Sequence, residues 1–108
     1  MWSYITADLD PMVVNTGYIC GKAGLLTLTL PATAAVGTVL CVTGIHTDLG
    51  WKIAQNANQI IHIGPDDTTT GVGGSLAASL KRDSVELVCV VANLEWNVTS
   101  MMGNISVV

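Results

Sequence analysis

Apolar and polar residues alternate in short segments along most of the chain. In residues 25–30, for example, Leu26, Leu28 and Leu30 alternate with two threonines, so an extended backbone places the leucines on one face. Asn, Gly and Pro separate such segments at short intervals, as turns between strands require. No window keeps an apolar stripe at helical spacing. The pattern predicts an all-β chain.

The predicted strands are short apolar segments bounded by turn residues. They are Trp2–Ile5, Met12–Val14, Tyr18–Cys20, Leu25–Leu30, Thr38–Thr43, Trp51–Gln55, Gln59–Ile63, Ser75–Ala78, Ser84–Ala92, Glu95–Ser100 and Ile105–Val108. Between them, Gly44–Gly50 is a polar loop and Gly64–Gly74 is expected to be long and flexible. Short strands at close spacing in 108 residues are typical of a single sandwich, jelly-roll or barrel domain, here residues 1–108.

Two of the predicted strands are apolar on both faces. In Ser84–Ala92 the odd-numbered positions are all apolar and the even-numbered positions include two valines, while Gln59–Ile63 has isoleucine on both faces. An antiparallel strand with one face in water alternates apolar and polar residues instead. The second apolar face therefore needs a partner outside the domain, and a symmetric copy of the chain is the usual one. We assign four residues to this subunit interface: Val88, Val90, Ile61 and Ile63.

The composition also indicates an oligomer. Hydrophobic residues make up 50% of the chain and charged residues only 11%, whereas a typical soluble domain has about 25% charged residues. Membrane insertion does not explain this, because no apolar run approaches the roughly 20 residues of a spanning helix. A net charge of −4 with only four Lys and Arg excludes nucleic acid as a partner. Surface buried between subunits of an oligomer is the better explanation.

The sequence offers little for catalysis. The three cysteines have no Cys-x-x-Cys spacing and are expected to be free thiols. No nucleophile motif or acid pair meets the requirements of a catalytic site, so we expect no enzyme and no cofactor. His46, His62 and Asp66 could be combined into a metal site, but their spacing matches no metal motif. A histidine at an interface and aspartates in solvated turns is the simpler interpretation, and a small enzyme or metal protein stays as a minor alternative.

Recognition is expected on loops that the strands hold in place. The loops Gly44–Gly50 and Gly64–Gly74 are long and polar enough, and they carry acceptors and hydroxyls suited to sugars or polar surface groups. The candidate ligand-binding residues are His46, Asp48, Asp66 and Asp67. Tryptophan can also stack on sugars, but the alternation around Trp51 and Trp96 predicts core positions for these two. For Trp2, near the start of the chain, the sequence does not decide between the core and a sugar site.

Three stretches of the chain resemble a known group of domains. They are Gly50–Gln59, Thr68–Ala77 and the segment that runs from Asp83 through Trp96 to Ile105. Together they resemble C-terminal domains of the phage tail-fibre and tail-needle-knob type, which also occur as adhesive trimeric fibre tips on bacteria. The resemblance runs from about Gly24 to Val108. It departs from the group in the segments 45–49 and 65–67.

The resemblance implies a trimeric, jelly-roll-like (TNF-like) antiparallel β-sandwich at the end of a longer fibre. It implies recognition of a cell-surface glycan or surface protein, on an extracellular or cell-surface fibre or a virion tail. It transfers no catalytic or ligand-binding residue, because the group shares none. The alternative is a purely structural trimerisation or capping domain of a fibre or capsid, without a ligand of its own.

Overall fold

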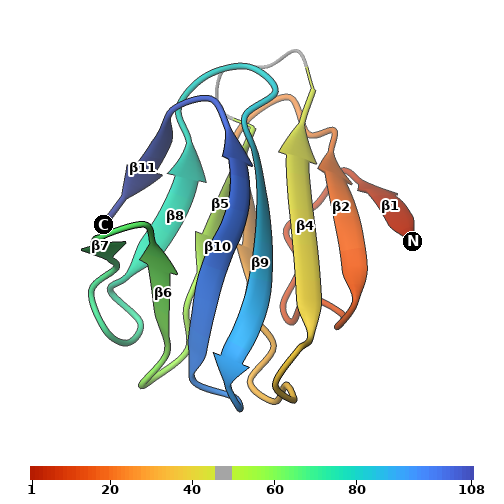
Figure 1. Cartoon of the computed structure of the whole chain (residues 1–108). Coiled ribbons are helices and arrows are strands. Elements are labelled where there is room, and N and C mark those ends of the chain that lie inside the picture. The colour runs from red at the N-terminus through yellow and green to blue at the C-terminus, as the bar shows by residue number, and fades with distance from the viewer. Residues whose placement is uncertain (46–49) are drawn as a thin grey trace.

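The computed structural model describes residues 1–45 and 50–108, and within these ranges it consists of two β-sheets and no helix. The larger sheet has seven strands in the order β1-β2-β4-β9-β10-β6-β7 (Figure 1). Its strands are β1 (Trp2–Ile5), β2 (Thr16–Cys20), β4 (Val39–Gly44), β6 (Ile60–Ile63), β7 (Asp66–Asp67), β9 (Ser84–Val91) and β10 (Glu95–Met102). The prediction of an all-β fold is confirmed.

The smaller sheet has four strands in the order β11-β8-β5-β3 and lies behind the larger one in Figure 1. Its strands are β3 (Leu26–Thr29), β5 (Trp51–Ala54), β8 (Ser75–Ala78) and β11 (Ile105–Val107). Apolar and polar residues alternate along these strands, so that the apolar side chains face the larger sheet. In β3, for example, Leu26 and Leu28 are fully buried and the threonines are not.

The strands are not purely antiparallel, and the sequence-based expectation is wrong on this point. From β2 to β6 the chain alternates between the sheets and runs in the same direction each time it returns to a sheet. Neighbouring strands laid down in this way are parallel: β2 with β4, and β3 with β5. β1 also pairs parallel with β2. β6 also pairs parallel with β10, while β9 and β10 form an antiparallel hairpin. Both sheets are therefore mixed.

Two further expectations need correction. Met12–Val14 is not a strand: the Met12 side chain lies in the core, and its backbone N–H donates to the Thr29 carbonyl at 2.8 Å. The segment Gly64–Gly74 is not a free loop, because it contains β7 and is tied down at several points. The Thr69 N–H, for example, donates to the Val108 carbonyl at 2.9 Å.

The core between the sheets contains both tryptophans that the alternation predicts there. Trp51 and Trp96 are each 0% exposed. The indole Nε1 of Trp51 donates to the Asp83 carbonyl at 2.8 Å, which satisfies its polar atom. Trp96 Nε1 has no hydrogen-bond partner among the described residues. The inward side chains of β9, Val85, Leu87 and Cys89, complete this side of the core.

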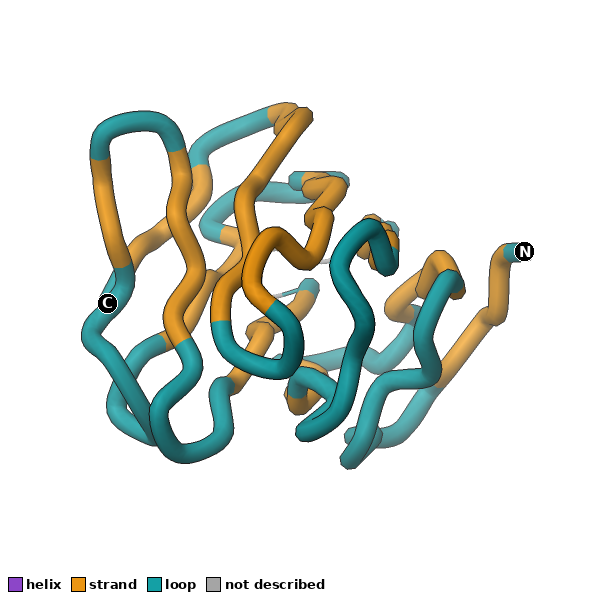
Figure 2. The backbone as a smooth tube through the Cα atoms, turned by 60° about the horizontal axis from the view of Figure 1, so that its bottom comes forward, coloured by secondary structure: helices purple, strands orange, loops and turns teal. Residues whose placement is uncertain are grey.

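Loops gather at the lower end of the sandwich, which comes forward in Figure 2. There two buried glutamines between β5 and β6 hold several of these loops together. The side-chain Nε2 of Gln59 donates to the carbonyls of Pro31, at 2.9 Å, and Asn93, at 3.0 Å. Its Oε1 accepts the Asn56 N–H at 2.8 Å. A side chain that is 1% exposed thus satisfies three backbone groups from separate loops.

Gln55 extends this network to the segment that follows β7. Its Nε2 lies within hydrogen-bond distance of the carbonyls of Gln59, Thr69 and Gly71, at 2.7, 3.0 and 2.9 Å. Its Oε1 accepts the hydroxyl of Thr68, which is itself buried. The two glutamines together form what we call the glutamine network.

Replacing Gln59 by Leu tests the network with little change in volume. Gln59→Leu leaves the carbonyls of Pro31 and Asn93 and the Asn56 N–H without these partners, so we expect the free energy of unfolding to fall by about 2 kcal/mol. The matched control is Asn104→Ala, at an exposed position, which should stay within about 0.5 kcal/mol of the parent. Urea unfolding followed by circular dichroism measures both. Equal unfolding midpoints for Gln59→Leu and the parent would contradict the role of the network.

Candidate functional site

The outward side of the seven-stranded sheet, here called the outer face, carries most of the residues with functional potential. Strand register places Val39 opposite Val88, Val88 opposite Asn97, Asn97 opposite His62, and His62 opposite Asp67. Register partners share a face of a sheet, so these side chains form one row across five strands. The row runs from apolar residues on β4 and β9 to ionisable residues on β6 and β7.

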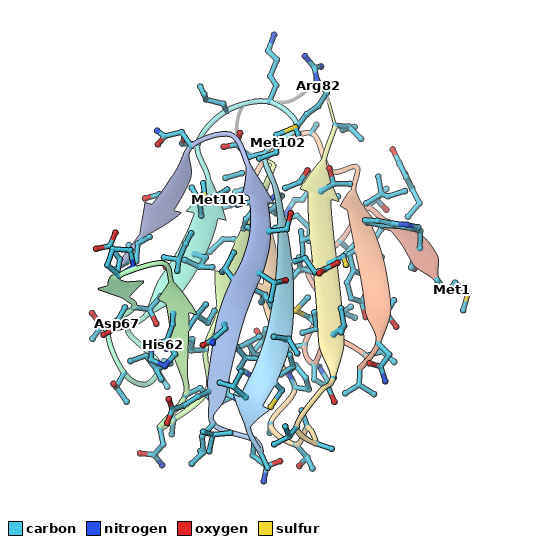
Figure 3. The ribbon with its side chains drawn as sticks, viewed as in Figure 1. Met1, His62, Asp67, Arg82, Met101 and Met102 are labelled. Carbon is cyan, nitrogen blue, oxygen red and sulfur yellow. The ribbon has the colours of Figure 1, made fainter. Side chains whose placement is uncertain are left out.

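At one end of this row, His62 lies between two carboxylates. Its Nδ1 is 2.6 Å from Asp67 Oδ1, and its Nε2 is 2.9 Å from Glu95 Oε1. The side chain of His62 is 27% exposed, whereas Asp67 and Glu95 are 59% and 41% exposed. Figure 3 shows the His62 and Asp67 side chains side by side at the lateral edge of the sheet. We call His62, Asp67 and Glu95 the histidine cluster.

The two carboxylates favour the protonated form of this histidine. The hydrogen bond with Asp67, followed by that with Glu95, raises the pKa of His62 above its usual value, and partial burial opposes them weakly. Because both ring nitrogens are engaged, the ring has no free lone pair for a metal ion or for a proton-transfer reaction. The cluster is therefore suited to joining β6, β7 and β10, and it is charged most fully at acidic pH.

The residues predicted to bind ligand are only partly connected in space. Asp67 contacts His62, whereas Asp66 is an exposed residue of β7 opposite Ile63. His46 and Asp48 lie outside the described residues. Within residues 1–45 and 50–108, no three His, Cys, Asp or Glu side chains gather as a metal site requires.

Sequence reasoning missed Glu95 as a partner of His62. The two residues are separated by 33 positions, and only the parallel pairing of β6 with β10 brings them together. Parallel neighbours leave no short turn between them that a sequence pattern could reveal.

Of the four residues that the sequence assigned to a subunit interface, two have outward side chains. Val88 is half-buried and Val90 is 37% exposed, and both point away from the core. Ile61 and Ile63 were assigned to the same surface, and this is wrong: Ile61 is 0% exposed and Ile63 packs against the core. The outward residues of β6 are Ile60 and His62. Ile61 faces inward because its register partner on β10 is the core residue Trp96.

The three cysteines are free thiols in different surroundings: Cys20 and Cys89 are buried and Cys41 is half-buried on the outer face. Burial raises the pKa of Cys20 to about 12. The pKa of Cys41 is also raised, first by burial and then by the nearby Glu86 carboxylate, whose Oε2 is 3.7 Å from the sulfur. Since the thiolate is the reactive form, neither group is activated as a nucleophile at neutral pH.

The histidine cluster predicts a pH-dependent contribution to stability. The pKa of His62 is raised in the folded chain, so its ion pairs contribute fully below the unfolded-state pKa of about 6.5 and are lost as pH rises through the folded-state value. His62→Gln removes this contribution. We expect the parent to exceed the variant in unfolding free energy by up to about 1 kcal/mol at pH 5.5, and by less at pH 8.5. Urea unfolding at both pH values measures the difference, and a gap independent of pH would contradict it.

The thiols predict an ordered reaction with Ellman's reagent. At pH 8 only Cys41 of the folded chain should react, and slowly, whereas Cys20 and Cys89 react after unfolding in urea. Glu86→Gln should speed the reaction of Cys41, because it removes a neighbouring negative charge that raises its pKa. Cys41→Ser should abolish the reaction in the folded state. Fast reaction of two thiols in the folded chain would contradict the burial pattern.

No helix of the described segments is long and apolar enough to cross a membrane. No protein-family model matches the chain, and a search of curated proteins also gives no match.

Proposed function

We propose that this chain is the trimeric recognition domain of a fibre tip, in which the two mixed sheets serve as a jelly-roll-like sandwich. The observation that carries the proposal is an apolar area on the outer face made by Val39, Val88 and Val90, which we call the valine patch. Val39 and Val88 are register partners on β4 and β9, and Val90 follows on the same face of β9. These strands are central in the sheet, where a monomer would place polar residues in contact with water.

The surroundings of the valine patch suit contact with a second copy of the chain. Asn97 and the histidine cluster border it on one side, and the side chains of the histidine cluster already have partners within the chain. The scarcity of charge supports the same assignment, since only 11% of residues are charged and half are hydrophobic. An interface core depleted of charge and rimmed by polar residues is typical of obligate oligomers. The threefold symmetry follows from the resemblance to fibre tips.

Recognition is the second half of the proposal, with a cell-surface glycan or surface protein as the ligand. Groups exposed on each subunit contact the ligand weakly, and display of three copies raises the avidity without new contacts. The domain then belongs to an extracellular fibre or a virion tail. A purely structural trimerisation domain would share the valine patch but would bind no surface.

The oligomeric state tests the assembly. Light scattering coupled to size exclusion should give about three times the chain mass of 11.2 kDa. Replacing Val88 and Val90 together by Lys would place like charges in one interface, and we expect monomers as a result. The control is Val36→Lys with Val72→Lys, at positions that are 66% and 74% exposed and lie outside the strands. A parent that is a clean monomer at micromolar concentration would contradict assembly, and a trimeric Val88→Lys/Val90→Lys variant would place the interface elsewhere.

Binding of the purified oligomer to surfaces tests recognition. The labelled parent is applied to a printed panel of bacterial polysaccharides and animal glycans, and to intact bacterial cells. Binding that is stronger for the trimer than for the Val88→Lys/Val90→Lys variant supports the proposal, because avidity requires several copies. A trimer that binds neither the glycans nor the cells would favour the purely structural alternative.

A further inference from the structure

A groove of about 420 Å³ opens on the outer face, on the side of the sheet where β1 lies. Trp2 borders it on β1, Cys41 and Thr43 on β4, Glu86 on β9 and Met102 on β10. It lies toward the end of β10 where Figure 3 labels Met101 and Met102, away from the histidine cluster. Asp66 and Asp67, the two described residues that the sequence predicted to bind ligand, do not line it.

Beside the groove, a glycine of β2 faces outward next to Trp2. Register places Trp2 opposite Gly17, Gly17 opposite Cys41, and Cys41 opposite Glu86, so a row of side chains crosses the sheet with a gap at Gly17. The Trp2 ring fills this gap. A Cβ at Gly17 would lie 2.7, 2.8 and 3.0 Å from three consecutive atoms of the six-membered ring. Such similar distances require that the flat face of the ring, rather than its edge, covers the glycine.

A second aromatic ring repeats this arrangement on the same strand. Tyr4 points to the same side of β1 as Trp2, and a Cβ at Gly21 would collide with its phenol ring. Trp2 is nevertheless 56% exposed and Tyr4 59% exposed. A ring that lies flat on the backbone of a sheet can be this exposed only through its opposite face. The two rings, which we call the aromatic platform, present two flat surfaces about 7 Å apart along β1.

Polar groups flank the aromatic platform. Glu86 Oε1 accepts the Thr99 hydroxyl at 3.0 Å, and Oε2 lies near the Cys41 thiol, which leaves further lone pairs of this exposed carboxylate open to solvent. The Thr43 and Ser84 hydroxyls, paired with each other at 2.6 Å, lie beside them. Glu86 is the one charged residue among the described residues that line the groove.

We propose that the aromatic platform and Glu86 bind a neutral oligosaccharide. The C–H face of a pyranose ring is apolar and stacks on Trp2, an adjoining ring reaches Tyr4, and sugar hydroxyls donate to the Glu86 carboxylate. A sialylated or phosphorylated sugar is disfavoured, because its negative charge would approach Glu86 with no described cation lining the groove. The inference deepens the recognition half of the proposed function, on which it rests, and moves the site from the loops to the sheet.

The tryptophans provide a direct measurement of binding. Trp51 and Trp96 are buried, so Trp2 alone should report a ligand in the groove through a change in its fluorescence. The trimer is titrated with maltotriose, cellotriose, mannotriose, chitotriose and lactose, and with 3′-sialyllactose as the anionic counterpart of lactose. We expect saturable changes with at least one neutral sugar and weaker binding of 3′-sialyllactose than of lactose. The same sugar should slow the reaction of Cys41 with Ellman's reagent, since this thiol lines the groove.

Substitutions separate stacking from a general structural effect. Trp2→Ala should weaken binding, read by calorimetry, by about tenfold, and Trp2→Phe should restore part of it. Gly17→Ala removes no ligand contact but displaces the Trp2 ring, so it should also weaken binding. Gly24→Ala is the matched control, because a Cβ there meets nothing within 4 Å. Light scattering and urea unfolding should show all four variants to be folded trimers.

Three results would overturn the site. The first is that no neutral sugar binds; the second is that Trp2→Ala and Gly17→Ala bind as well as Gly24→Ala. The third is that Trp2→Ala dissociates the trimer, since the aromatic platform would then be a contact between copies of the chain. The proposed function fails separately: a trimer that still binds the glycan panel or intact cells keeps its recognition role after the site is rejected. A trimer that binds neither the neutral sugars nor the glycan panel nor intact cells would contradict both the sugar site and the recognition function.

Discussion

The structure depends on the burial of two amide side chains where the chain passes from one sheet to the other. Gln55 follows β5 of the small sheet and Gln59 precedes β6 of the large one, and their side chains satisfy four backbone groups of three other segments. An unsatisfied carbonyl in these positions would be costly, so the glutamines fix where the loops lie. They also fix the start of β6, whose pairing with β10 brings His62 to Glu95. The histidine cluster is thus a distant consequence of the glutamine network.

The path of the chain through its N-terminal half determines where the aromatic platform lies. Because the chain returns to each sheet in the same direction, β2 and β4 are parallel, and β1 pairs parallel with β2. Their register places Trp2 beside Gly17 and Gly17 beside Cys41. Glycine at position 17 would normally weaken a strand, since it has no side chain to pack. Here the neighbouring Trp2 ring supplies the missing contact. The glycine and the tryptophan therefore act as a pair, and neither has an evident role alone.

The sequence predicted those features that depend on one strand at a time. Alternation identified the inward leucines of β3, the core positions of Trp51 and Trp96, and the outward valines of β9. It failed for β6, because this strand has isoleucine on both faces and its orientation is set by Trp96 on another strand. The parallel pairs, β7 and the Glu95 contact were equally hidden, since each depends on which strands become neighbours. Glycine 17 and Trp2 were visible, but their adjacency was not.

The position of Glu86 limits how far a subunit contact can extend over the outer face. Glu86 and Val88 are two residues apart on β9, about 7 Å, so a partner that covers the valine patch reaches the edge of the groove. Among the described residues no Lys or Arg pairs with this carboxylate. Its burial in an apolar contact would therefore carry a large desolvation cost. In the trimer that we propose, the contact would stop between Val88 and Glu86, and the aromatic platform would stay in water at the rim of the subunit interface.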